Sequence, residues 1–210
     1  MEVTASKAGE MSREETIVAA ATQLFAEYSY AAVGIRAIAE SVGIMSSSLY
    51  YYFPSKEDIL FRICQQATRD FIAVHGAVLA SHETGGSRAE TLKTLMGSHV
   101  RYFWENRLAQ QVAARELSQL SPERFEEVRD WQRAYTADLV EYVEMGVAAG
   151  EFDVPEPAIV VRAALDMLNS VFRWFTPRKN LGIDEVAELY ADLIVDRLLG
   201  AAHVSRGENR

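Results

Sequence analysis

Helical periodicity is the feature that most restricts the fold of this chain. Apolar residues recur at three- and four-residue intervals along most of the sequence, which places them on one face of an α-helix. An early example is the stripe formed by Ile17, Ala20, Ala21, Leu24 and Phe25. No segment alternates convincingly between apolar and polar residues, as a half-buried strand would. The sequence therefore predicts an all-α fold of about nine helices, without an internal repeat.

Capping and turn residues divide the helices into two unequal groups. Ser12 with Glu15 forms a capping box at the start of the first helix, and Ser55 with Asp58 forms an approximate one further on. The apolar positions that follow Ser55 predict a helix of ~7 turns leading from one domain to the next. We expect a disordered arm at 1–11, a small domain at 12–58, a larger domain at 59–200 and a frayed tail at 201–210.

Composition points to an intracellular protein. Hydrophobic residues make up 49% of the chain and charged residues 24%, which is ordinary for a folded soluble protein. No apolar run approaches the ~20 residues needed to cross a bilayer, and residues 1–11 do not read as a signal peptide. Cys64 is the only cysteine, so it cannot form an intrachain disulfide. We expect a cytoplasmic location and no membrane partner.

Net charge gives no support to a nucleic-acid partner. The chain carries a formal charge of -9, and residues 1–60 contain four basic and eight acidic side chains. Because neutralising phosphates requires Lys and Arg, this balance argues mildly against DNA. A few well-placed cations can suffice when hydroxyls and backbone amides supply the other contacts, so the case for DNA depends on sequence pattern.

The segment from Ile35 to Lys56 reads as a helix-turn-helix. A short helix ends at Gly43, where a left-handed residue is needed, and a second short helix follows. Hydroxyls can bond to bases or phosphates, and the start of the next helix, at Lys56, favours a phosphate. The second helix offers the hydroxyls of Ser46, Ser47, Ser48, Tyr50, Tyr51 and Tyr52. Helix-Gly-helix patterns also occur in packed cores, and we expect Leu49 and Phe53 to be buried.

This segment resembles the TetR family of regulators. The matching stretches are residues 19–27 (AAATQLFAE), 35–44 (IRAIAESVGI) and 48–57 (SLYYYFPSKE). The resemblance implies that 12–58 is a DNA-binding domain and 59–200 a ligand-binding and dimerisation bundle. It implies a homodimer on double-stranded, pseudo-palindromic operator DNA, with a small-molecule effector. It also implies phosphate contacts from Tyr50 and Lys56, Arg36 at the groove edge, and Ser46, Ser47 and Tyr51 nearest the bases.

Four positions depart from the family pattern. Ser29 replaces a usual Gly, Val33-Gly34 and Met45 stand where Thr and Ser commonly cap helices, and Ser47 replaces a frequent Gly. A lost cap costs about 1 kcal/mol, so local stability or a phosphate contact is in doubt. Ser46 could serve as a substitute cap one residue later.

Candidate effector contacts lie in the second domain. Aromatic and Met side chains could line an apolar cavity, although such residues are more often plain core. The candidates are Phe103, Trp104, Trp131, Tyr135, Met167, Phe172 and Trp174. Arg173 differs because it lies in an apolar stretch, so it must pair with an acid such as Asp166, reach the surface, or meet an anionic ligand. Residues 169–177 resemble a segment of TetR-type repressors of fatty-acid and sterol breakdown, whose effectors are acyl-CoA thioesters. That resemblance adds Asn169 and Arg173 as effector contacts.

The last two long helices predict a dimer seam. Residues 159–175 and 186–198 each present a broad apolar face, and two such helices per subunit can form a four-helix interface. The histidines lack metal-ligand spacing, and there is neither a nucleophile elbow nor a phosphate-binding glycine loop, so we expect no enzyme activity, metal or cofactor. The alternative hypothesis is a helical ligand-binding or interaction protein without specific DNA binding. Salt-dependent, sequence-specific DNA binding would separate the two.

Overall fold

The computed structural model describes residues 11–80 and 87–201. Within these ranges the regular elements are helices, apart from an isolated bridge between Arg178 and Leu181. The predicted all-α class is therefore confirmed. The predicted arm and tail lie outside the described residues, except for Met11 and Ala201. In the described part of the chain, no helix is long and apolar enough to cross a membrane.

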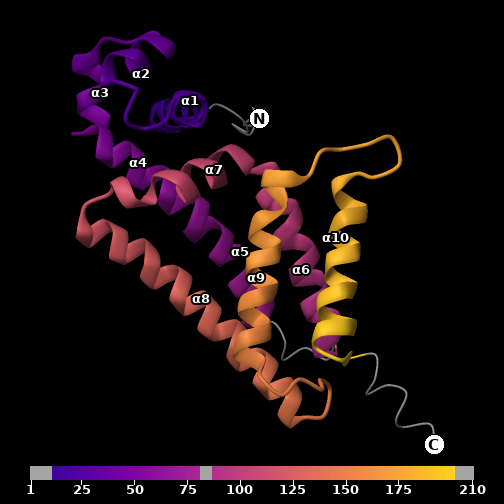
Figure 1. Ribbon diagram of the computed structural model, residues 1–210. Coiled ribbons are helices and arrows are strands. Elements are labelled where there is room, and N and C mark those ends of the chain that lie inside the picture. Colours follow the sequence, from indigo (N-terminus) through magenta and orange to yellow (C-terminus); the bar gives the residue numbers. More distant parts are fainter. Residues whose placement is uncertain (1–10, 81–86, 202–210) are drawn as a thin grey trace, which may run out of the picture.

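The helices follow one another with short connections (Figure 1). The N-terminal group is α1 (Arg13–Tyr28), α2 (Ile35–Ser41) and α3 (Ser46–Tyr52). Next come α4 (Lys56–Gln65), a π-helical segment (Gln66–Asp70) and α5 (Phe71–Ala80). The remainder is α6 (Arg88–Glu105), α7 (Arg107–Glu116) with a 3-10 turn (Leu117–Gln119), α8 (Pro122–Ala148), α9 (Pro157–Trp174) and α10 (Ile183–Asp192) with a second π-helical segment (Leu193–Leu198).

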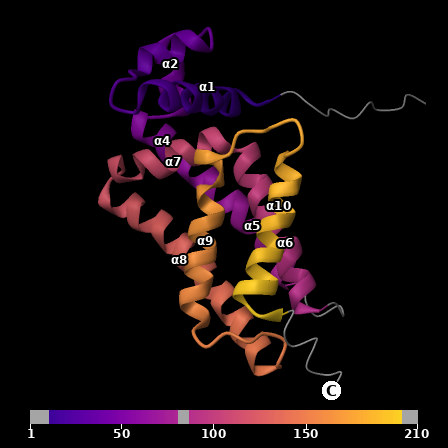
Figure 2. The same cartoon turned by 45° about the vertical axis from the view of Figure 1, so that its right-hand side comes forward.

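The N-terminal helices form a compact group at one end of the molecule (Figure 2). The predicted capping box starts α1, with the Glu15 amide donating to Ser12 Oγ over 3.1 Å and the Ser12 amide donating to Glu15 Oε2 over 2.7 Å. Phe25, Ile38 and Leu49 are fully buried between the helices. Burial of such side chains contributes about 2 kcal/mol each, so these contacts fix how α3 is presented.

The core of this group continues into the rest of the chain. Its buried cluster includes Ile59, Leu60 and Ile63 of α4, and also Val112 of α7 and Val128 of α8. The predicted domain boundary between residues 58 and 59 therefore falls inside α4. The N-terminal helices share buried apolar surface with the start of the second domain.

The predicted long helix after Ser55 is present as α4, the π-helical segment and α5 in unbroken succession. The π-helical turn at Gln66–Asp70 is a feature that the sequence pattern did not predict. Gln110 of α7 donates its side-chain amide to the carbonyl of Ala67 in this turn over 2.9 Å. A π-turn disturbs the regular ladder of backbone hydrogen bonds, and Gln110 provides this carbonyl with a buried partner.

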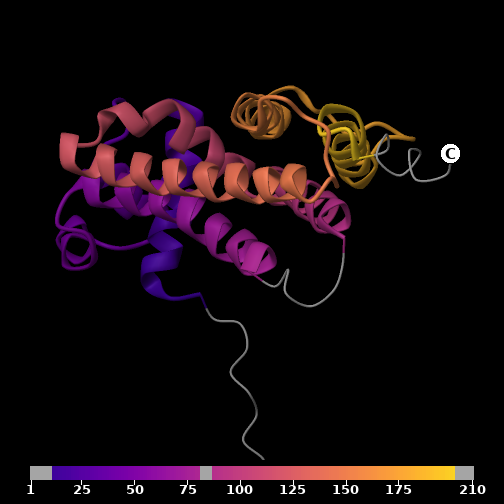
Figure 3. The same ribbon diagram turned by 90° about the horizontal axis from the view of Figure 1, so that it is seen from below.

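The second domain is built around α6. Helices α9 and α10 pack on it and appear nearly end-on in Figure 3, whereas α5 and α8 run across that view. Helices α8 and α9 meet near their connection and diverge toward α7 (Figures 1 and 2). The core between these helices contains Leu95, Val100, Leu139, Leu168 and Val171.

One side of α9 and α10 leaves large apolar residues exposed. Ile159 is 65% exposed, Trp174 54% and Leu189 62%, and Leu193 and Leu198 are also exposed. Trp174 stacks on Tyr190 with a centroid distance of 6.4 Å, so the two helices present a joint aromatic and aliphatic surface.

Candidate functional site

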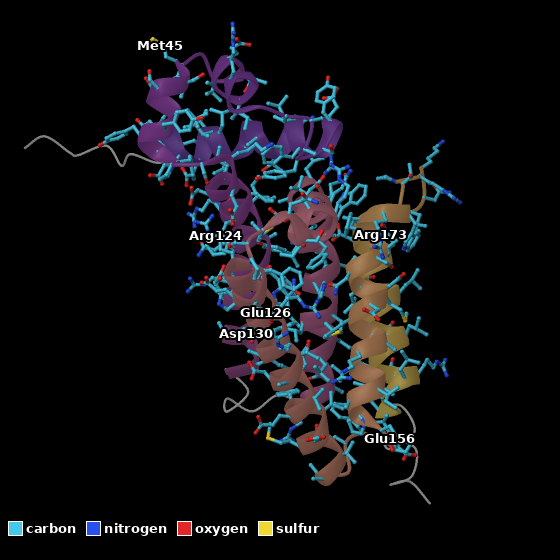
Figure 4. All side chains as sticks on the ribbon, turned by 60° about the vertical axis from the view of Figure 1, so that its left-hand side comes forward. Met45, Arg124, Glu126, Asp130, Glu156 and Arg173 are labelled. Atoms are coloured by element: carbon cyan, nitrogen blue, oxygen red, sulfur yellow. The ribbon has the colours of Figure 1, made fainter. Side chains whose placement is uncertain are left out.

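Helices α2 and α3 form the predicted helix-turn-helix. The turn contains Gly43 with φ of +68°, a left-handed conformation that glycine adopts without strain. Leu49 anchors α3 in the core, and the opposite side of the helix is open to solvent. Tyr51 is 85% exposed, Tyr50 51% and Met45 72%, and Met45 marks this end of the molecule in Figure 4. Ser47 is also exposed, whereas Ser46 and Ser48 are half-buried.

Both helices of this motif lack a side-chain cap, as their sequence predicted. The N-caps are Gly34 and Met45, and neither makes a side-chain hydrogen bond to its helix. The prediction that Ser46 serves as a substitute cap is wrong. Ser46 is already the first residue of α3, where its backbone is helical, so its hydroxyl is not placed as an N-cap acceptor.

The two candidate DNA-contacting cations of the helix-turn-helix domain, Arg36 and Lys56, differ in the contacts that they already make within the protein. Arg36 is exposed and pairs with Glu40 over 2.8 Å, a contact that raises the pKa of its guanidinium. Lys56 donates to the carbonyls of Tyr30 and Val33 over 2.9 and 3.0 Å and lies 4.2 Å from the Tyr30 ring centroid. It therefore fixes the connection between α1 and α2, a role that the sequence reasoning missed. An ammonium has three donors, so a phosphate contact by the third stays a prediction.

A cavity of about 1040 Å³ lies between α7, α8 and α9, with the π-helical segment, α5 and α6 forming part of its wall. Five of the predicted effector contacts line it: Phe103, Tyr135, Asn169, Phe172 and Arg173. Its apolar lining also includes Phe71, Ile72, Leu117, Val140 and Leu165. The cavity is open to solvent and can accept an elongated ligand with an apolar part.

Four predicted effector contacts do not line this cavity. Trp104 packs against Phe175, with ring centroids 5.1 Å apart. Trp131 packs against Phe61, next to the N-terminal core, with the Arg69 guanidinium 5.3 Å from its ring. Trp174 is exposed on the face shared with α10. Met167, in α9, is half-buried away from the cavity. On a helix, one position corresponds to a rotation of ~100°, which separates Met167 and Trp174 from the cavity-lining positions beside them.

Arg173 lies at the wall of the cavity and is exposed to solvent. Its guanidinium lies 5.9 Å from the Phe172 ring, and within the described residues it makes no ion pair with Asp166. Of the alternatives drawn from the sequence, the structure therefore shows the arginine reaching the surface. Figure 4 shows Arg173 on α9, apart from the labelled Arg124, Glu126 and Asp130 of α8.

Three further arginines line the cavity and were missed in the sequence. Arg133 is held by Glu126 and Asp130 over 2.9 and 2.7 Å. Arg129 donates to Gln132 over 3.2 Å, and Arg162 belongs to the same stripe of α9 as Asp166, Asn169 and Arg173. These four α9 positions are spaced by four, three and four residues. A polar stripe at helical spacing in an otherwise apolar helix could have identified these α9 residues from the sequence.

His99 is the other cavity residue that sequence reasoning overlooked. It is 1% exposed, and its Nε2 lies 2.9 Å from Asn169 Oδ1. Desolvation, aided by the neighbouring His75, lowers the pKa of His99 to about 3, so its imidazole is neutral near pH 7. It lies on the buried face of α6 with Leu95, Met96 and Val100, where a histidine is easily taken for a core residue.

Comparison with known proteins agrees with this arrangement. Residues 17–63 match the family model described as bacterial regulatory proteins, tetR family, and residues 85–198 match that of the tetracyclin repressor-like C-terminal domain. The HTH-type transcriptional repressor KstR2 of Mycolicibacterium smegmatis is 30% identical over 204 residues, which is 94% of each chain.

Solved structures show the same fold. The TetR family regulator PfmR from Thermus thermophilus superposes with a TM-score of 0.77 at 32% identity, covering 85% of this chain and 96% of its own. AibR, solved in complex with isovaleryl coenzyme A and operator DNA, gives a TM-score of 0.74 at 21% identity, covering 90% of this chain and 98% of its own. At that lower identity the likeness concerns the fold alone. The chain belongs to the TetR family of bacterial transcriptional regulators, with an N-terminal helix-turn-helix domain and a C-terminal ligand-binding domain.

Proposed function

We propose that this regulator is a repressor that binds operator DNA as a homodimer and is released by a coenzyme A thioester. The observation that supports the proposal is the structural connection between the helix-turn-helix and the cavity. Ala67, Thr68, Phe71 and Ile72 line the cavity, and they belong to the continuous helix that begins at Lys56, four residues after α3 ends. A ligand that shifts this helix would change the position of α3.

For DNA recognition, we propose that the exposed side of α3 enters the major groove. Ser46, Ser47 and Tyr51 would lie nearest the bases, with Ser48 on the same helix. Tyr50 and Lys56 would contact phosphates, and Arg36 would lie at the groove edge. The solvent exposure of Tyr50 and Tyr51 supports this assignment, because neither side chain is buried in the core of the isolated subunit.

The exposed apolar surface of α9 and α10 supports a homodimer. Ile159, Trp174 and Leu189 would be buried against the same residues of a second copy in a four-helix seam. A two-fold dimer places its two α3 helices on two half-sites of a palindromic operator. In this proposal residues 12–58 act as the DNA-binding unit and 59–200 as the sensing and pairing unit, and the protein works in the cytoplasm without a metal, cofactor or catalytic role.

For the effector, the arginines at the cavity support an anionic group. Arg129 belongs to the first turns of α8 and Arg173 to the last turn of α9, and both line the cavity. Phosphate groups prefer the planar donors of arginine, and the aromatic lining from Phe103, Phe172 and neighbouring residues would accept an acyl group. The likeness to AibR, which was solved with isovaleryl coenzyme A, is in keeping with this class of ligand.

The proposal is tested by binding the purified protein to the intergenic DNA upstream of its own gene, with a scrambled duplex as control. We expect specific binding that weakens as salt rises and that a series of acyl-CoA thioesters relieves. Tyr51→Ala should lower the operator affinity about tenfold or more, whereas Tyr28→Ala, an exposed tyrosine of α1, should leave it unchanged.

A separate substitution, Arg173→Ala, tests the proposed class of effector. Arg173→Ala should raise the acyl-CoA concentration needed for DNA release about tenfold or more without changing operator affinity in its absence. Specific DNA binding that no acyl-CoA relieves would leave the regulator and remove this effector class. No specific binding at low salt, with the right DNA, would favour the alternative of a helical ligand-binding protein that does not read DNA.

A further inference from the structure

Three buried polar atoms without partners gather around one aromatic ring. Among the described residues, His75 Nε2, His99 Nδ1 and the Tyr135 hydroxyl are buried and make no hydrogen bond. Their rings all pack on Phe71, with centroid distances of 4.1, 4.5 and 5.2 Å. Because buried polar groups are nearly always satisfied, three unsatisfied atoms in one place point to a group that the isolated chain does not supply.

The hydrogen bonds of the two histidines determine what that group must offer. His99 Nε2 faces the side-chain oxygen of Asn169, and His75 Nδ1 faces the carbonyl of Phe71 over 2.8 Å. Both partners accept, so these nitrogens carry the protons. Burial lowers the pKa of both imidazoles and keeps them neutral, which makes the remaining nitrogen of each an acceptor. His99 Nδ1 and His75 Nε2 therefore need a donor.

The cluster lies directly behind the cavity wall. His99, Tyr135 and Phe71 all line the cavity, while the unsatisfied atoms themselves are covered. Rotation of a neighbouring ring such as Phe103, whose centroid is 4.4 Å from that of His99, would open a path to them. Asn169, the partner of His99, is one turn of α9 from Arg173, or ~6 Å along the helix axis. The polar cluster and the mouth arginine can thus be reached by one ligand.

We propose that His99 and Tyr135 form a subsite for a hydroxyl group carried on the apolar part of the effector. A hydroxyl can both donate, as His99 Nδ1 requires, and accept, as the Tyr135 phenol requires, and the two rings pack on the same Phe71 ring. A ketone could only accept and would leave the histidine unpaired, and an ammonium group would lose its hydration in apolar surroundings. The inference rests on the proposed function, since it takes this cavity as the effector site, and it narrows the effector to a hydroxylated acyl thioester.

The first test compares matched ligands on matched variants. Dodecanoyl-CoA, 3-hydroxydodecanoyl-CoA and 12-hydroxydodecanoyl-CoA are titrated into the protein by calorimetry. We expect one hydroxylated ligand to bind about tenfold more tightly than dodecanoyl-CoA. Tyr135→Phe should abolish this preference, because it removes the phenol that donates to the ligand hydroxyl. Tyr102→Phe, which alters a neighbouring ring on Phe71 outside the cavity lining, should keep the preference.

A second arm does not depend on coenzyme A. The nitrogen resonances of ¹⁵N-histidine-labelled protein are recorded with 2-naphthol and with naphthalene, and His99→Phe assigns the His99 signals. 2-Naphthol alone should shift His99 Nδ1 upfield, as a newly accepted hydrogen bond requires. If no CoA ester binds but this shift occurs, the proposed effector class fails and the hydroxyl subsite stands. If CoA esters bind without preference for a hydroxyl, or if neither naphthol nor hydroxylated esters move this resonance, the subsite is overturned.

Discussion

Ser29 holds the backbone in a conformation that suits only glycine well. Its φ is 71° and its ψ is 156°, and within the described residues it is the one non-glycine with positive φ. This region of backbone space is strained for any residue with a Cβ, at a cost of about 1 to 3 kcal/mol. The strain is located at the C-cap of α1, at the start of the connection that Lys56 fixes.

Ser29→Gly should therefore stabilise the protein by about 1 kcal/mol or more, because glycine relieves the strain. Urea unfolding followed by circular dichroism measures the change. Ser98→Gly, in the middle of α6, is the matched control and should destabilise by about 0.5 kcal/mol, since glycine is a poorer helix former than serine. Equal effects of the two substitutions would contradict the strain at Ser29.

Burial of the His99 imidazole makes the free energy of unfolding depend on pH. Its folded-state pKa is about 3, whereas an unfolded histidine titrates near 6.5. Between these values the unfolded chain binds the extra proton, so the stabilisation is fully present above pH 6.5 and is lost as the pH falls. The free energy of unfolding should decrease by about 2 kcal/mol from this residue between pH 7 and pH 5. His99→Phe should give a shallower pH profile in chemical denaturation, and parallel profiles would rule out this contribution.

For single residues, the sequence predicted local roles such as caps and turns better than contacts with distant parts of the chain. The capping box of Ser12, the turn at Gly43 and the uncapped start at Met45 follow from local chemistry, and the structure contains all three. The environment of Arg173 or His99 depends on partners from distant helices. Trp131 was proposed for the effector on its residue type, yet its neighbours Phe61 and Arg69 come from the α4–π segment.

The π-helical segment Gln66–Asp70 is the element that links the helix-turn-helix domain to the cavity. Apolar spacing predicted one continuous helix here, and could not predict the π-turn, because Gln110 lies 43 residues further along the chain. Helices α8 and α9 begin at Pro122 and Pro157, where proline at the first turn favours a helix through its own backbone.

Gln110→Ala should leave the Ala67 carbonyl buried without its partner and destabilise the protein by about 1 to 3 kcal/mol. Thermal unfolding monitors the loss. Gln111→Ala, a neighbouring half-buried glutamine on α7, should change stability by about 0.5 kcal/mol or less. Equal unfolding temperatures for the two alanine variants would contradict a stabilising role of the Gln110–Ala67 hydrogen bond.

Across the whole molecule, polar clamps attach the DNA-binding helices to the second domain. Arg124 of α8 contacts Asp58 and Glu57, and the Ser121 amide donates to Glu57 over 3.0 Å. Arg115 of α7 bonds to the carbonyl of Phe25 and pairs with Glu116, which accepts from the Tyr30 amide over 3.2 Å. Motion of α7 or α8 around a ligand is therefore passed to α1 and α4 by direct contacts.

Arg124→Ala should weaken the communication between the two sites. We expect the effector to lower operator affinity by a factor at least fivefold smaller than in the wild type. Because the coupling between two binding sites is reciprocal, operator DNA should lower effector affinity by the same smaller factor. Fluorescence anisotropy with and without the effector measures both. Arg101→Ala, which breaks the ion pair to Asp184 between α6 and α10, is the control that should keep full coupling.

The shared core of α4, α7 and α8 has a consequence for exchanging sensors between regulators. A gene fusion cut after residue 58 would join the N-terminal helices to a foreign sensor that brings its own residues in place of Ile59, Leu60, Ile63, Val112, Leu120 and Val128. The buried contacts across this junction would then have to match by chance. The smallest portable module is therefore the N-terminal helices together with the junction on which they rest, and recombination, natural or engineered, should succeed only where that junction travels too.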